Sequence, residues 1–117
     1  MNGKILINDY FTDFDAAPNT AADGRPYPET ILSITLSGTN QSGEEPNRVM
    51  IRFRDSDRLA ANPSISGSNI ILDLPKHDFP MIQDLLQKSI IAQTNPLSLT
   101  VFYREASNNT WVNFSLR

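Results

Sequence analysis

Apolar and polar residues alternate with a period of two in several separate stretches of this chain, a pattern that limits it to a fold rich in sheet. In residues 30–37, TILSITLS, Leu32, Ile34 and Leu36 alternate with hydroxyl side chains. Successive side chains of a strand point to opposite faces of a sheet, so this spacing predicts a half-buried strand. Residues 4–11, 48–54 and 69–74 also predict strands, being rich in branched and aromatic residues.

One stretch has the helical period instead. In residues 77–89, HDFPMIQDLLQKS, apolar side chains recur at helical spacing, at Ile82, Leu85, Leu86 and then Ile90. Asp78 occupies a candidate N-cap position and Pro80 falls in the first turn, where proline is tolerated. Lys88 stands where a helix C-terminus favours a cation. These signals predict one helix.

The C-terminal residues 96–117 predict a hairpin with Asn108 and Asn109 in a two-residue turn, because Asn tolerates positive φ. This register pairs Val101 with Leu116, Tyr103 with Phe114 and Glu105 with Val112. It places the large apolar residues on one face, apart from Phe102 and Trp111, and a slip of one residue would scatter them.

Three segments between these elements have no regular period. Residues 12–29 carry three prolines, a glycine and small polar residues, which predict a long surface loop. Residues 38–47 predict a turn that joins strands 30–37 and 48–54 as a hairpin, and residues 55–68 predict a second loop.

Four strands, a helix and two further strands predict an α+β domain, in which one helix packs on a face of a mainly antiparallel sheet of about six strands. The chain has 117 residues, which fits a single domain spanning 1–117. One helix covers only part of six strands. We therefore expect the remaining sheet surface to be curled, solvated or covered by another copy, and we expect a homo-oligomer.

Composition narrows the classes of function. The formal net charge of −3 argues against extended binding to nucleic acid, which needs a dense basic surface. The chain has no cysteine, so disulfides, thiolate chemistry and cysteine zinc sites are excluded. Its first residues, MNGKILINDYF, are too polar for a signal peptide, and no run of apolar residues is long enough to span a membrane. We expect a cytoplasmic protein with no membrane association.

The stretch RVMIRFRDSDR, residues 48–58, gathers four of the ten basic side chains of this acidic protein. With Val49, Ile51 and Phe53 on the core face, the opposite face receives Arg48, Met50, Arg52 and Arg54. Neighbours on one face stand about 7 Å apart, so Arg52 and Arg54 could bind one anion together, and Arg58 could contact the same anion from the loop. Arginine at all four basic positions suits bidentate contacts. The alternative is a solvated face whose arginines pair with loop acids at Glu44, Glu45, Asp55 and Asp57.

A second candidate surface is aromatic. The hairpin register turns Phe102 and Trp111 away from the core, beside Arg104 and Thr100. Such a surface suits a protein interface or the stacking of a planar ligand. The alternative is a second buried layer beneath segment 12–29, with Phe14 or Tyr27 packed on it.

Motifs of catalysis are not found in the sequence. The single histidine, His77, precedes the predicted helix and fits a helix-entry role, and no Gly-x-Ser-x-Gly elbow or phosphate loop occurs. The acidic pairs at 13–15 and 55–57 lack the spacing of a calcium loop. We expect neither an enzyme nor a cofactor or metal.

The sequence therefore predicts a small binding module. The leading hypothesis is an anionic, nucleotide-like ligand held in a homo-oligomer by arginines and aromatic side chains, namely Arg52, Arg54, Arg58, Arg104, Phe102 and Trp111. The alternatives are an adaptor or inhibitor that docks on another protein through the C-terminal hairpin, and a structural subunit of a bacterial or viral assembly.

Overall fold

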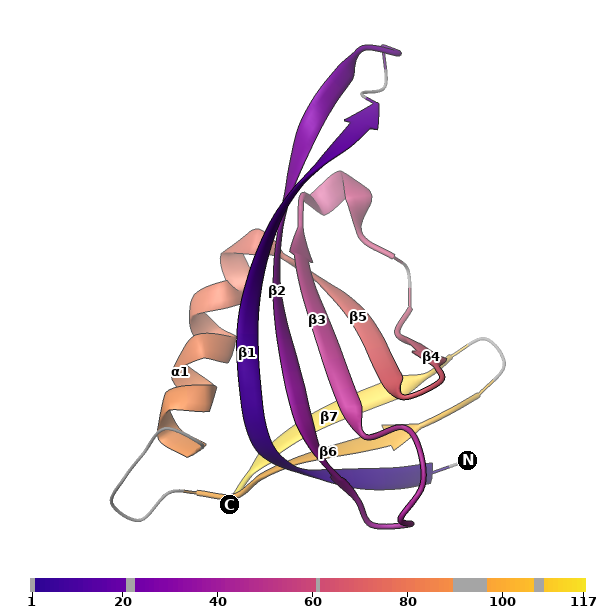
Figure 1. Ribbon diagram of the computed structural model, residues 1–117, viewed down its shortest axis with the longest axis vertical. Helices are drawn as coiled ribbons and strands as arrows, with labels where there is room; N and C mark the ends of the chain where they lie inside the picture. The colour runs from indigo at the N-terminus through magenta and orange to yellow at the C-terminus, as the bar shows by residue number, and fades with distance from the viewer. Residues whose placement is uncertain (1, 21–22, 61, 90–96, 107–108) are drawn as a thin grey trace.

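A computed structural model describes residues 2–20, 23–60, 62–89, 97–106 and 109–117. In these residues the chain forms a curled, half-barrel sheet with one helix (Figure 1). The strands are β1 (Asn2–Thr20), β2 (Pro26–Asn40), β3 (Arg48–Arg54), β4 (Ser64–Ser66), β5 (Asn69–Pro75), β6 (Leu99–Arg104) and β7 (Trp111–Leu116). The helix is α1 (Phe79–Ser89), and two short 3-10 turns are η1 (Ser56–Arg58) and η2 (Lys76–Asp78).

The sheet has seven strands in the order β4-β5-β3-β2-β1-β6-β7. The prediction of an α+β chain with one helix is confirmed, but the mainly antiparallel sheet of about six strands is instead a mixed sheet of seven, in which β3 and β5 are parallel. The sequence segment 55–68, predicted as a loop, contains η1 and β4 and carries the chain back so that β5 begins beside the start of β3. A strand of three residues, such as β4, is too short to show a period of two.

The sheet bends sharply where β1 leaves β6 and continues along β2. The β1–β2 register shifts between Ile7 and Asp9, which marks a bulge. Opposite it, a Cβ on Gly38 would overlap the carbonyl oxygen of Leu6. The close approach of the two backbones at this bend therefore requires glycine at position 38.

The core lies between α1 and the inner face of the sheet. Val49, Ile51 and Phe53 are fully buried, which confirms the predicted core face of β3. Ile82 and Leu86 of α1 pack into the same cluster, to which every strand of the sheet contributes a buried or partly buried apolar side chain. The helix begins at Phe79, directly after the predicted N-cap position, and its Lys88 pairs with Asp84 at 2.9 Å.

Residues 12–29, predicted as a loop, are instead mostly strand, because β1 and β2 continue as a two-stranded ribbon. Their pairing runs from Ala16 with Thr30 to Thr20 with Pro26, beyond the last residue of β3. We call residues 9–20 and 23–31 the arm; its outer part projects from one end of the molecule (Figure 1). Proline is tolerated there because each strand of a two-stranded ribbon has an open edge, so a missing N–H need not interrupt pairing.

The C-terminal hairpin is confirmed, but its predicted register is wrong by two residues. Val101 pairs with Phe114 and Tyr103 with Val112. Because β6 ends at Arg104 and β7 begins at Trp111, the connection is longer than the predicted two-residue turn, and Asn108 lies outside the described residues. A shift of two residues keeps every side chain on its predicted face.

Candidate binding surface

Arg52 and Arg54 of β3 lie on the outer face of the sheet, where carboxylates of their own chain bind them. The Nε of Arg52 donates to Oδ1 of Asp73 at 2.6 Å, across the β3–β5 pair. The Asp73 side chain is fully buried, and its second oxygen accepts the Ala60 backbone N–H at 2.9 Å. Arg52 thus joins two strands and helps hold the segment after η1 against β5.

Arg54 and Arg58 hold the arm to the body of the protein. Arg54 makes a bidentate contact, with its Nε and Nη2 each 2.8 Å from an oxygen of Glu29, which is only 2% exposed. Arg58 donates from Nη2 to the backbone oxygen of Thr20, near the tip of the arm. Planar guanidinium groups suit such fixed, two-pronged contacts.

These partners differ from those that the sequence suggested. The carboxylates on Arg52 and Arg54 come from other strands, at Asp73 and Glu29, rather than from the neighbouring loops. Of the loop acids, Asp57 lies 3.9 Å from Nε of Arg58, and Asp55 pairs with Lys76 at 3.0 Å. An anion that entered between the β3 arginines would have to compete with these carboxylates.

The basic strand and the aromatic hairpin do not meet within one chain. Both lie on the outer face, but β2 and β1 separate β3 from β6. Neighbouring strands are about 4.8 Å apart, so three steps across the sheet span roughly 14 Å. One chain therefore carries two separate surfaces. The first contains Arg52, Arg54 and Arg58, and the second contains Phe102, Arg104 and Trp111.

The outer face of β1, β6 and β7 forms the surface that we call the outer hairpin surface. The strand register sets its rows: Asn2 lies beside Arg104, and Arg104 beside Trp111. In the next rows Lys4 lies beside Phe102, and Leu6 beside Thr100. Its members are Asn2, Lys4, Leu6, Thr100, Phe102, Arg104, Trp111, Asn113 and Ser115, which alternate with inward residues such as Ile5 and Val101.

Two large apolar side chains stand open on this surface. Leu6 is 51% exposed and Trp111 is 46% exposed, while Phe102 is partly buried. The guanidinium carbon of Arg104 lies 5.8 Å from the centre of the Trp111 ring, a cation–π contact. An exposed indole held by an arginine is a suitable anchor for an interface or for a planar group.

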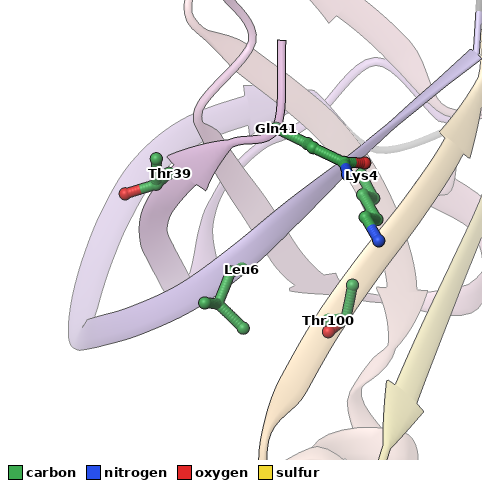
Figure 2. A pocket seen from close by; sticks show the side chains of 5 residues that line it. All are labelled: Lys4, Leu6, Thr39, Gln41 and Thr100. Atoms are coloured by element: carbon green, nitrogen blue, oxygen red, sulfur yellow. The ribbon is translucent and has the colours of Figure 1, made fainter. Parts of the chain in front are cut away.

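A pocket of about 270 Å³ opens on the surface where β1, β2 and β6 come together. It is lined by Lys4, Leu6, Thr39, Gln41 and Thr100 (Figure 2). Figure 2 shows Leu6 and Thr100 facing the same space from adjacent strands, with Lys4 beside them. A second pocket, of about 310 Å³, includes Phe102, Arg104 and Trp111 in its lining. Both are at the lower end of the volumes that small-molecule sites have, about 300–1,000 Å³.

The outer hairpin surface is cationic in a protein of net negative charge. The strand segments 2–6, 99–104 and 111–116 contain Lys4 and Arg104 but no Asp or Glu. The nearest acids along the chain are Glu105, directly after β6, and Asp9, three residues after Leu6 on β1. A negatively charged group is therefore the ligand whose charge matches the surface.

The remaining candidates from the sequence lie elsewhere. His77 is in η2 with 78% of its side chain exposed, and its Nε2 is 3.5 Å from Oδ1 of Asp78. Asp13 and Asp15 are exposed on the arm, where Phe14 is 66% exposed and thus does not form a second buried layer. Among the residues that the structure describes, no three His, Cys, Asp or Glu side chains gather as a metal site.

Sequence reasoning missed Lys4, Leu6, Thr39 and Gln41. In KILI the residues on both faces of the strand are apolar or long, so the alternation does not mark Lys4 and Leu6 as a surface. Thr39 and Gln41 lie in a segment predicted as a turn. Only the pairing of β1 with both β2 and β6 brings them together.

No protein-family model, curated protein or solved structure matches this chain. In the part of the chain that the structure describes, no helix has the length and apolar character needed to cross a membrane.

Proposed function

We propose that this protein is a non-catalytic binding module that docks an acidic, apolar segment of a partner protein on its outer hairpin surface. The proposal rests on one observation. Two cations, Lys4 and Arg104, lie on the same surface as the exposed apolar side chains of Leu6 and Trp111, and the strand segments of this surface contain no acid. Interfaces concentrate their binding energy in aromatic and arginine anchors of this kind.

The engagement of the β3 arginines favours a protein segment over a nucleotide-like ligand. The two pockets, of about 270 and 310 Å³, are near the lower limit of about 300 Å³ for small-molecule sites and accommodate one or two side chains of a partner. The arginine pair expected to hold a small anion, Arg52 and Arg54, is bound to Asp73 and Glu29. A docking surface needs no help from these two residues.

The test uses an eight-residue fluorescent peptide of alternating Asp and Phe, with a matched peptide that has Lys in place of Asp. We expect the acidic peptide to bind with micromolar affinity and to change the fluorescence of Trp111, the single tryptophan. Lys4→Ala or Arg104→Ala should weaken binding about tenfold, because each removes a desolvated charge contact worth about 1.4 kcal/mol. Lys88→Ala, which removes an exposed cation from α1, is the control.

Equal binding of the two peptides, or equal affinities of the Lys4→Ala and Lys88→Ala variants, would contradict the proposal. ATP serves as the competitor that represents a planar anion. If ATP binds wild-type protein more tightly than the acidic peptide does, and loses affinity with Arg104→Ala, a small anionic ligand replaces the protein segment as the occupant.

A further inference from the structure

The arm has the negative charge that the outer hairpin surface lacks, and it adds exposed apolar side chains of its own. Its strand residues, 9–20 and 26–31, contain Asp9, Asp13, Asp15 and Glu29 but no Lys or Arg. Glu29 is buried against Arg54, and the three aspartates are exposed. Phe11 and Phe14 add two large exposed aromatic side chains, at 50% and 66% exposure.

Most of the described residues in the outer part of the arm are exposed. Five residue pairs, from Ala16 with Thr30 to Thr20 with Pro26, lie beyond the end of β3, a length of roughly 17 Å at about 3.4 Å per residue. A two-stranded ribbon alone is marginally stable in water, so contact with another surface would stabilise the outer part of the arm. Arg54 binds Glu29 and Arg58 binds the backbone oxygen of Thr20, so the outer part of the arm is fixed to the body of the protein. Docking therefore does not have to order it first.

The arm and the outer hairpin surface lie at opposite ends of the molecule (Figure 1). The longest dimension of the chain is 49 Å, and the arm is a continuation of the same ribbon whose first residues, 2–6, belong to the surface. One chain therefore cannot place its own arm on its own surface. Any contact between the two must join different copies.

The spacing of the charged side chains supports this contact, in addition to their opposite charges. Asp13 and Asp15 are two residues apart on one face of β1, about 7 Å. Lys4 and Arg104 occupy diagonal positions on adjacent strands, two pairs apart in the register, at about 7–8 Å. Two carboxylates can thus face two cations while one aromatic ring enters the pocket beside Leu6.

We propose that this chain assembles head to tail, with the arm of one copy docked on the outer hairpin surface of the next. The inference rests on the proposed function and names a second copy as the partner. Because the two contacting surfaces differ, the interface is heterologous, and it builds rings or open chains rather than a symmetric pair.

Two charge variants test the assembly by sedimentation velocity. The arm variant carries Asp13→Lys and Asp15→Lys, and the surface variant carries Lys4→Glu and Arg104→Glu. All four residues are at least partly exposed, and circular dichroism and the melting temperature of each variant verify the fold. Wild-type protein should give species heavier than the 13.1 kDa monomer, whereas each variant alone should sediment as a monomer.

Mixing the variants gives the decisive result. The arm variant carries cations on both contacting surfaces and the surface variant carries carboxylates on both, so unlike variants match at every contact, and an equimolar mixture should again form species heavier than 13.1 kDa. A single chain that carries all four substitutions should assemble again, because the charges are exchanged between the two surfaces.

Three outcomes overturn the inference: a monomeric wild-type protein at all concentrations up to the solubility limit, variants that each assemble like wild type, or a mixture of the two variants that stays monomeric. A monomeric wild type that still binds the acidic peptide refutes self-assembly alone. Loss of peptide binding as well refutes the proposed function with it.

Discussion

Breaking the contact between Arg54 and Glu29 should cost far more than breaking a surface ion pair. Arg54→Met removes two hydrogen bonds of 2.8 Å from a carboxylate that is 2% exposed. Removal of one partner from a buried pair typically costs 3–5 kcal/mol, and we expect about 3 kcal/mol because the Arg54 side chain retains 19% exposure. At an unfolding entropy of about 2.1 cal/mol/K per residue, this lowers the melting temperature by roughly 12 °C.

Glu29→Gln in the same chain should restore part of the loss. The double variant buries a neutral amide instead of a charged carboxylate, which costs less, so we expect it to regain about 1–2 kcal/mol. A gain of stability on adding a second substitution is the signature of a buried charge, and a double-mutant cycle measures it.

The matched control is Arg25→Met. Arg25 pairs with Asp23 at 3.5 Å, with side-chain exposures of 86% and 60%, so its loss should cost less than about 1 kcal/mol. Urea unfolding followed by far-ultraviolet circular dichroism gives the free energies. The reasoning is refuted if Arg54→Met costs no more than Arg25→Met, or if Glu29→Gln lowers the stability of the Arg54→Met variant further.

Two further predictions concern the bend of the sheet and are measured by the same urea unfolding. Gly38→Ala should destabilise by about 2 kcal/mol or more, since its Cβ would overlap the Leu6 carbonyl oxygen; an unchanged midpoint would show that the backbones separate freely there. Asn40→Ala should cost about 2–3 kcal/mol, because the buried Asn40 amide donates to the Pro46 carbonyl at 2.7 Å and the Tyr103 hydroxyl at 2.9 Å. A cost below about 0.5 kcal/mol would mean that water replaces both bonds.

Local pattern was a good guide to strand faces and a poor guide to strand ends. Burial of Val49, Ile51 and Phe53 follows from alternation alone, because a strand that packs one face on a core must bury every second residue. The prolines of the arm led to the wrong prediction of a loop. Proline is compatible with a strand that has an open edge, but the sequence does not show which strands have one.

The candidate site was only half visible in the sequence. Phe102, Arg104 and Trp111 were found because hairpin pairing is local, and an error of two residues in register leaves their face unchanged. Lys4 and Leu6 were missed because their neighbours come from β6, about 95 residues along the chain. The partners of Arg52 and Arg54 lie 21 and 25 residues away, too far for any local rule to select them.

By itself the sequence determined the class of fold, the helix and the inward face of β3, because hydrophobic periodicity acts through neighbours a few residues apart. Tertiary structure alone decided the parallel β3–β5 pair, the arm, and the outer hairpin surface that carries two cations in an acidic chain. The physical reason is that strand pairing joins backbone groups common to all residues, so the identity of a partner strand is set by the burial of the whole sheet rather than by either strand.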